Sequence, residues 1–149
     1  MSRTDLIKGR YSESNREYFI TFVSKERATI FSNDNLARIF CKTIAANEFQ
    51  CDCNWLTWVL MPDHFHGLLR VGDKSTLPQI IKHLKGYTAR AINIELKQSK
   101  PVWQQGFFDR ALRKNEDRKQ VARYILANPL RKKIVLCLGD YPYWNSVYL

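Results

Sequence analysis

The spacing of hydrophobic residues in the first half of the chain predicts a strand, a helix and a β-hairpin. Residues 16–24 alternate between polar and apolar side chains, as a half-buried strand does. A helix is expected from the N-cap Asn33 to about residue 49. Residues 51–71 indicate two strands joined by a tight Met-Pro-Asp corner at 61–63. The expected buried side of the helix is Leu36, Ile39, Phe40, Thr43, Ile44 and Phe49.

The second half of the chain predicts a second helix, a fourth strand and a third helix. The second helix should open near Pro78, and residues 107–113 alternate as a strand does. Asn115 is the expected cap of the third helix, which should end or kink at Asn128, because Pro129 disfavours helical geometry there. The apolar residues of the second helix recur at Leu77, Ile80, Ile81, Leu84, Tyr87, Ala91 and Ile94.

This order of elements predicts an α+β fold of the ferredoxin-like split βαβ type. Strands and helices follow as β-α-β-β-α-β, with an additional C-terminal helix. In that architecture both crossover helices cover one face of the sheet and leave the other face partly open. The 149 residues suffice for a single domain, in which the polar residues 1–15 are expected to form a flexible arm.

Two histidines directly follow the predicted corner of the hairpin. A strand has a side-chain period of two, so His64 and His66 should share one face, while Phe65 and Gly67 point to the other. Because Phe65 suits the helix-covered side, we expect the histidines on the open face. There they either bind one metal ion together or form a hydrogen-bonded polar patch.

A zinc site that combines these histidines with Cys51 and Cys53 is excluded by distance. With the corner at residue 62, His66 should pair across the hairpin near Trp58. Cys53 then lies about five residues further along, or roughly 15–17 Å away. The cysteines are instead expected to be reduced and mostly buried thiols.

The third helix offers a nucleophile and a further metal ligand. Tyr124 and Asn128 are four residues apart, so they should be neighbours on one helix face. The Asn128 amide oxygen could join the histidines around Mg²⁺ or Mn²⁺, which accept oxygen and nitrogen ligands and keep open positions. The rival nucleophile Tyr87 has the spacing of a core residue, and Ala91, four residues later, cannot bind metal.

These motifs resemble a known family. His64-Phe-His66 after an apolar strand is similar to the motif of HUH single-strand DNA endonucleases. Four further motifs, which occur in the same order, resemble the REP-associated tyrosine transposases, and together the resemblance covers about residues 16–149. They are Trp103-Gln104, Phe108-Asp109, Arg113 and Tyr124-Ile-Leu-Ala-Asn128-Pro129.

The resemblance implies a function for each of these site residues. Tyr124 would be the nucleophile, and His64, His66 and Asn128 would bind the metal. The substrate would be single-stranded or hairpin DNA from repetitive extragenic palindromes, cut through a 5′-phosphotyrosine intermediate. Such a link conserves the bond energy, so rejoining needs no ATP.

The charge of the chain favours a polyanionic partner. Lys and Arg number 24 against 14 acidic residues, which gives a net charge of +10. Arg110, Arg113 and Lys114 lie closest in the chain to the proposed nucleophile, so we expect them to carry more of the DNA path than the basic residues of the second helix, Lys82, Lys85 and Arg90. Gln104 should help to recognise bases, and Trp103 either stacks a base or fills the core.

Two other functions remain compatible with the sequence. One is a non-catalytic ferredoxin-like nucleic-acid-binding protein, although such modules place stacking aromatic residues where this chain has histidines. The other is a phosphodiesterase that uses water. A cytoplasmic protein is expected, because the chain has no signal-like segment and no apolar run of the roughly 20 residues that a membrane helix needs. Monomer and homodimer are both open.

Overall fold

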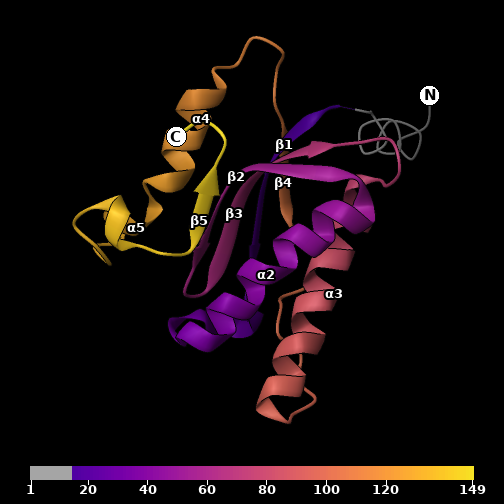
Figure 1. Ribbon diagram of the computed structural model, residues 1–149, viewed down its shortest axis with the longest axis vertical. Helices are drawn as coiled ribbons and strands as arrows, with labels where there is room; N and C mark the ends of the chain where they lie inside the picture. The colour runs from indigo at the N-terminus through magenta and orange to yellow at the C-terminus, as the bar shows by residue number, and fades with distance from the viewer. Residues whose placement is uncertain (1–14) are drawn as a thin grey trace.

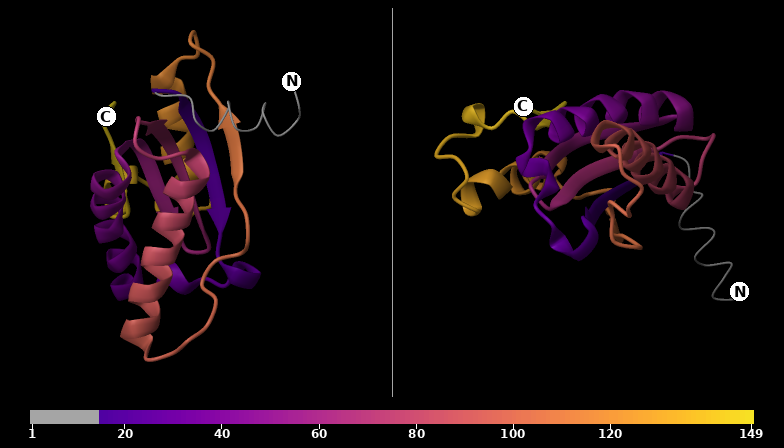
Figure 2. Two further views of the ribbon diagram at one scale, coloured as in Figure 1. Left: turned by 90° about the vertical axis from the view of Figure 1, so that its right-hand side faces the viewer. Right: turned by 90° about the horizontal axis from the view of Figure 1, so that it is seen from below.

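The computed structural model describes residues 15–149, which form a five-stranded antiparallel sheet with helices on both faces (Figures 1 and 2). Most of the arm expected over residues 1–15 lies outside the described residues. The strands are β1 (Glu17–Val23), β2 (Cys53–Met61), β3 (His64–Val71), β4 (Phe108–Ala111) and β5 (Trp144–Ser146). The α-helices are α2 (Asp34–Cys51), α3 (Leu77–Leu96), α4 (Arg118–Leu126) and α5 (Asn128–Arg131). Short 3₁₀ turns lie at Lys25–Arg27, Ile30–Ser32 and Leu138–Asp140.

The predicted split βαβ arrangement is confirmed. The sheet order is β4-β1-β3-β2-β5, so its first four strands have the arrangement in which each βαβ unit encloses a strand of the other. The fifth strand was not predicted. It has three residues and pairs with the outer edge of β2, from Thr57 with Ser146 to Val59 with Trp144.

Helices α2 and α3 cover one face of the sheet (Figure 2). Asn33 caps α2 as predicted, and its side chain accepts a hydrogen bond from the backbone nitrogen of Leu36. Thr76 and Gln79 form a capping box that starts α3. The core on this face is built mainly from aromatic and branched side chains, among them Tyr18, Ile20, Phe22, Phe40, Trp55, Phe65, Leu69, Ile80 and Leu84.

The outer ends of both helices differ from the predicted apolar stripe. Phe49 is 84% exposed and Ile94 is 72% exposed, so their predicted burial is wrong. In α3 the buried positions continue through Thr88 and Ile92 instead, because the side chain of Thr88 meets that of Thr43 on α2, with the hydroxyl oxygens 3.1 Å apart. A contact between two small residues turns the buried side of α3 away from the predicted stripe.

The other face carries a second, smaller hydrophobic cluster. Helix α4 and the C-terminal segment pack on it, so it is less open at the hairpin than expected. The Tyr141 hydroxyl donates a hydrogen bond to the backbone oxygen of Leu60 there. The cluster consists of Leu56, Val59, Met61, Leu68, Leu112, Ile125, Leu126 and Tyr141.

Helix α4 begins two residues later than expected. Its N-cap is Asp117 and not Asn115, since the Asp117 carboxylate accepts hydrogen bonds from the backbone nitrogens of Lys119 and Gln120. Glu116, which would lie in the first turn of a helix capped by Asn115, instead binds Arg110 on β4. Among the residues that the structure describes, no helix combines the length and hydrophobicity needed to cross a bilayer.

Candidate active site

His64 and His66 lie together at the start of β3, next to the hairpin corner. Their ring centroids are 4.6 Å apart. They occupy the face opposite Phe65, as the period of a strand predicts, and Phe65 lies in the core under α2 and α3. His64 is only 6% exposed and His66 is partly buried, so the histidines are more enclosed than the expected open face implies.

One nitrogen of each histidine is held by a neighbouring side chain. Nδ1 of His64 lies 2.6 Å from Oδ1 of Asp63, and Nδ1 of His66 lies 2.7 Å from Oγ1 of Thr21. A carboxylate can only accept, so His64 donates through Nδ1 and keeps the lone pair on Nε2. A hydroxyl can accept as well as donate, so the Thr21 contact is compatible with the same tautomer of His66. Metal-binding histidines are commonly oriented in this way, so the pair fits a metal that binds through both Nε2 atoms.

The charge states of these groups also fit a metal site. Burial lowers the pKa of His66 to about 3, and neighbouring positive charge adds to the effect. Burial likewise lowers the pKa of His64, although Asp63 counteracts it. Burial alone would raise the pKa of Asp63, but the hydrogen bond with His64 and the charges of His64 and Arg27 bring it below its ordinary value. At neutral pH the imidazoles are therefore uncharged, which is the form that binds metals.

Asn128 is the first residue of α5, a short helix that contacts β2, the strand paired with that of the histidines. It is 6% exposed, and its amide nitrogen donates to the backbone oxygen of Ile125 at 2.9 Å, which leaves the amide oxygen as the atom suited to a metal. The backbone nitrogen of Lys132 donates to the Asn128 backbone oxygen. The charge of Lys132 is close enough to both histidines to lower their pKa further, beyond the effect of burial.

The described residues contain no group of three or more His, Cys, Asp or Glu side chains that could hold a metal. The candidate metal ligands are therefore the imidazoles of His64 and His66 and the amide of Asn128. Cys53 pairs with Val71 at the far end of the hairpin from His64, which pairs with Met61, so the exclusion of a mixed zinc site is confirmed. Burial also raises the pKa of Cys53 to about 12, which keeps it a thiol.

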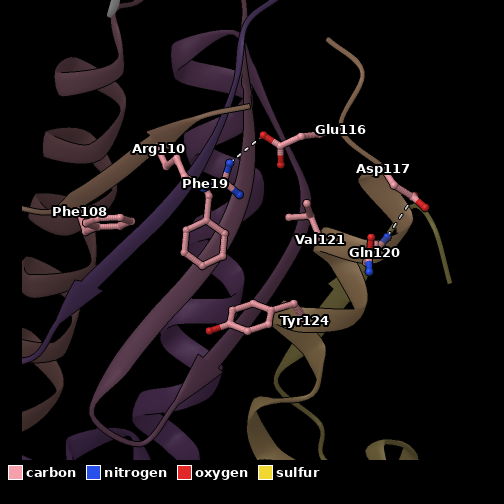
Figure 3. A pocket seen from close by; sticks show the side chains of 8 residues that line it. All are labelled: Phe19, Phe108, Arg110, Glu116, Asp117, Gln120, Val121 and Tyr124. Carbon is pink, nitrogen blue, oxygen red and sulfur yellow. Dashed lines mark hydrogen bonds and ion pairs between the residues drawn. The ribbon is translucent and has the colours of Figure 1, made fainter. Parts of the chain in front are cut away.

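Tyr124 projects from α4 beside the ring of Phe19 (Figure 3). It is 59% exposed. The ring of Phe19 on β1 connects the two parts of the site, since its centroid lies 6.2 Å from Tyr124 and 5.9 Å from His66. The guanidinium of Arg131 covers the Tyr124 ring at 4.4 Å from the centroid.

Tyr124 and Asn128 do not share an uninterrupted helix face, which corrects the prediction. Helix α4 ends at Leu126, and Asn128 opens the short helix α5. A break was expected at Asn128, because Pro129 follows it, and on its two sides Tyr124 is exposed while Asn128 is buried. The rival Tyr87 is 48% exposed and is not the core residue that its spacing predicted, but it lies on α3, which covers the opposite face of the sheet from the histidines.

A pocket of about 450 Å³ opens beside Tyr124, between β1, β4 and the start of α4 (Figure 3). Its walls combine aromatic and polar side chains, chiefly Phe19, Phe108, Tyr124, Arg110, Glu116 and Gln120. Of the residues that line this pocket, only Arg110 and Tyr124 were predicted from the sequence as site residues. The two residues that orient the histidines were not predicted either, although Thr21 is a polar residue inside an apolar strand and Asp63 directly precedes His64.

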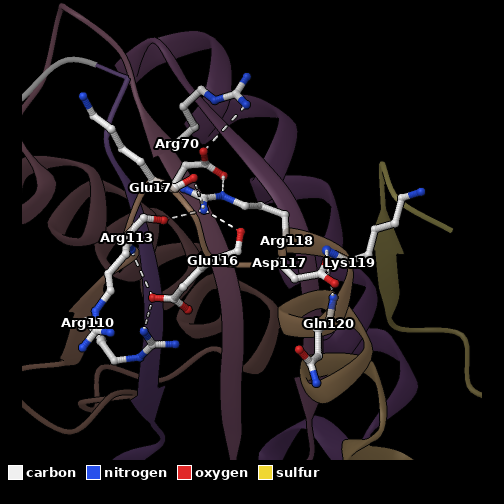
Figure 4. A network of polar contacts seen from close by, with 10 residues as sticks. Glu17, Arg70, Arg110, Arg113, Glu116, Asp117, Arg118, Lys119 and Gln120 are labelled. Atoms are coloured by element: carbon white, nitrogen blue, oxygen red, sulfur yellow. Dashed lines mark hydrogen bonds and ion pairs between the residues drawn. The ribbon is translucent and has the colours of Figure 1, made fainter.

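The predicted DNA-binding cations lie on β4 and on the loop that leads from it to α4, as Figure 4 shows for Arg110 and Arg113. Arg110 lines the pocket and pairs with Glu116 at 2.7 Å. Arg113 and Lys114 are exposed in the loop that follows. Arg118 fixes this loop, because its Nη1 donates to the backbone oxygens of Arg113 at 2.6 Å and Glu116 at 2.8 Å.

Trp103 belongs to the core, so the idea that it stacks a base is wrong. It is 8% exposed, and its ring packs against Phe22 and Phe31. Gln104 is exposed, and its backbone nitrogen donates to Val23, the residue that pairs with His64. Gln104 therefore lies at the same end of the sheet as the histidines.

Comparisons with known proteins identify a matching family model and similar solved structures. A family model described as "Transposase IS200 like" matches residues 12–128, a span that includes both histidines, Tyr124 and Asn128. A solved structure of a REP-associated tyrosine transposase bound to a REP hairpin is similar with a TM-score of 0.75 and 20% identity, over 91% of this chain and 79% of that one. A crystal structure of a candidate transposase from Deinococcus radiodurans has a TM-score of 0.53 and 24% identity, over 76% and 91% of the two chains. A search of curated proteins gives no match.

Proposed function

Because the chain belongs to the IS200-like transposase family, we propose that it cuts and rejoins single-stranded DNA through a covalent bond between Tyr124 and a 5′-phosphate. One observation carries the proposal. Two neutral histidines, each held through Nδ1, lie on one face of the sheet, and the ring of Phe19 lies between His66 and the exposed Tyr124. The site thus combines the parts of a metal-assisted phosphoryl transfer with a protein nucleophile.

The residues suited to hold the metal are His64, His66 and Asn128. When bound there, Mg²⁺ or Mn²⁺ would polarise the phosphodiester and neutralise charge that develops on it. The three protein groups are neutral, so they leave the positive charge of the cation available to the DNA. Asp63 and Thr21 hold the imidazoles in the orientation that such binding requires.

Tyr124 supplies the nucleophilic oxygen. In the proposed step the phenolic oxygen forms a bond to phosphorus, and the bond from phosphorus to the 3′ oxygen breaks. The phenolic proton is lost and the leaving oxygen gains one, so the products are a 5′-phosphotyrosine and a free 3′-hydroxyl. Arg131, next to the Tyr124 ring, adds positive charge where the phosphate would bind. Attack by another 3′-hydroxyl reverses the step and joins two strands.

We extend the proposal to the substrate as single-stranded or hairpin DNA of the REP type. The structurally similar REP-associated tyrosine transposase is bound to a REP hairpin, and the net charge of +10 suits a nucleic acid. The strand would pass the exposed loop with Arg113 and Lys114 before it reaches Tyr124. Gln104 at the histidine end of the sheet is a candidate for contacts with bases.

The proposal is tested with hairpin DNA that carries a label at its 3′ end, because the 3′ fragment is the one that would remain bound to Tyr124. After incubation with Mn²⁺, a denaturing gel should show labelled DNA that migrates with the protein and is absent with a chelator. DNA labelled at the 5′ end should give only a free, shortened strand. Cleavage without an adduct would indicate attack by water, and binding without cleavage would indicate a non-catalytic DNA-binding protein.

A further inference from the structure

The pocket beside Tyr124 has an aromatic wall that the protein itself leaves uncovered. Phe108 on β4 is 57% exposed, although it lies in the sheet. Its ring meets that of Phe19 edge to face, with centroids 6.4 Å apart and planes at 77°. Tyr124 closes the third side at 59% exposure (Figure 3). Adjacent exposed aromatic rings in a hollow indicate a ligand that covers them.

The strand and the helix that supply these rings also carry groups that hydrogen-bond in a plane. Gln120 lies four residues before Tyr124 on α4, so the two side chains are neighbours on that helix. The guanidinium of Arg110 is held at the pocket by Glu116, which also accepts a hydrogen bond from the backbone nitrogen of Arg113. An amide and a guanidinium beside aromatic rings are the groups that recognise the edge of a nucleobase.

We propose that this pocket binds one unpaired nucleobase of the DNA strand that Tyr124 attacks, stacked on Phe108 and Phe19 with its edge toward Gln120 and Arg110. The proposal rests on the function proposed above. The volume of about 450 Å³ is in the range of small-molecule sites. A base inside a duplex has both faces stacked and its edge paired, so only an unpaired base can enter.

Such a pocket would also position the scissile phosphate. Tyr124 is part of its wall, so the phosphate next to the bound base comes close to the phenolic oxygen (Figure 3). This assigns base recognition to Phe108 and Phe19 in place of Trp103, which is buried in the core under the other face of the sheet.

The test uses Tyr124→Phe protein without metal, which keeps the ring in the pocket while cleavage is blocked. The fluorescent base 2-aminopurine is placed at each unpaired position of a hairpin oligonucleotide in turn, and its quenching on binding is measured. We expect strong quenching at one position. Adding Phe108→Ala should abolish this quenching and raise the Kd roughly 5- to 150-fold, the effect of losing one base stack. Phe108→Tyr should retain both.

The matched control is Phe49→Ala, which removes another exposed phenylalanine, on α2 and 84% exposed. It should change neither quenching nor affinity. Quenching that survives Phe108→Ala, or that occurs at no unpaired position, overturns the base pocket. The measurement involves no cleavage, so the two proposals are tested separately. Base binding can be refuted although Tyr124 forms its adduct, and adduct formation can be refuted although the base binds.

Discussion

The Asp63 carboxylate lies 2.6 Å from Nδ1 of His64 and so leaves Nε2 of this histidine for a metal. If that orientation matters, Asp63→Asn should weaken Mn²⁺ binding about 10- to 100-fold without abolishing it, as is typical when the partner of a ligand is lost. His64→Ala and His66→Ala remove ligands themselves and should abolish both Mn²⁺ binding and metal-dependent cleavage. Titration calorimetry of the protein without DNA measures the binding directly.

The control for the metal experiment is His83→Ala, which removes the third histidine of the chain, on α3. It should bind Mn²⁺ like the unmodified protein. His64 is buried, so its replacement should also cost about 1–2 kcal/mol of stability, and thermal unfolding must show that the variant is folded. Folded His64 and His66 variants that cleave normally in Mg²⁺ and Mn²⁺ would show that the histidines are structural.

Salt dependence distinguishes the two basic surfaces. Each phosphate contact that is lost should lower the slope of log affinity against log salt by about 0.7 for a single strand. Arg113→Glu and Lys114→Glu should therefore weaken DNA binding and flatten its salt dependence, whereas Lys82→Glu and Arg90→Glu on α3 should do less. Equal or reversed effects would place the DNA on the face that α2 and α3 cover.

Lys85 is unsuitable for this comparison, although its position on α3 groups it with Lys82. Its ammonium group donates to the backbone oxygens of Gln104 at 2.8 Å and Gly106 at 2.9 Å. Charge reversal there would disturb the loop that carries Gln104, so a change in binding would not report a contact with DNA.

Arg118 should stabilise the loop between β4 and α4, the helix that contains Tyr124. Its side chain is 20% exposed, and besides its contacts with backbone oxygens its Nε lies 3.4 Å from Oε1 of Glu17 on β1 (Figure 4). Arg118→Ala removes these contacts, so we expect a loss of about 1–2 kcal/mol in urea unfolding and faster hydrogen exchange in α4. Lys119→Ala, at the exposed neighbouring position, should change neither. Equal stability of the two variants would refute the role of Arg118.

Two glycines should respond to alanine in opposite directions. A Cβ on Gly67 would lie 2.7 Å from two ring carbons of Trp55, so Gly67→Ala should destabilise the protein by about 1–3 kcal/mol. Gly86 lies inside α3 with nothing within 4 Å of the added atom, so Gly86→Ala should stabilise it by about 0.5–1 kcal/mol. Urea unfolding of both variants checks the tight contact behind the histidines, and an unchanged Gly67→Ala variant would contradict it.

The parts of the fold that could be predicted from the sequence depend on local rules. The hairpin, the shared face of His64 and His66 and the cap at Asn33 follow from side-chain period, turn chemistry and capping. The cap of α4 was misplaced because Asn115 and Asp117 are both good caps. The choice between them depends on Glu116, which is held by Arg110 from another strand.

The remaining features depend on contacts between distant segments. The three residues of β5 form a strand only because the edge of β2 is available to them, and the buried side of α3 turns at Thr88 because Thr43 lies opposite. Trp103 has a side chain that could stack on a base, and only its contacts with Phe22 and Phe31 show that it belongs to the core. The base pocket likewise combines β1, β4 and α4, which no local pattern connects.

The central claim is that Tyr124 bonds covalently to DNA, and the most direct measurement locates that bond. Protein treated with hairpin DNA and Mn²⁺ is digested with nuclease and protease, and the modified peptide is identified by mass spectrometry. We expect the nucleotide on the peptide that contains Tyr124, no adduct in Tyr124→Phe with DNA binding nearly intact, and a normal adduct in Tyr87→Phe. An adduct that persists in Tyr124→Phe and is lost in Tyr87→Phe would contradict the account.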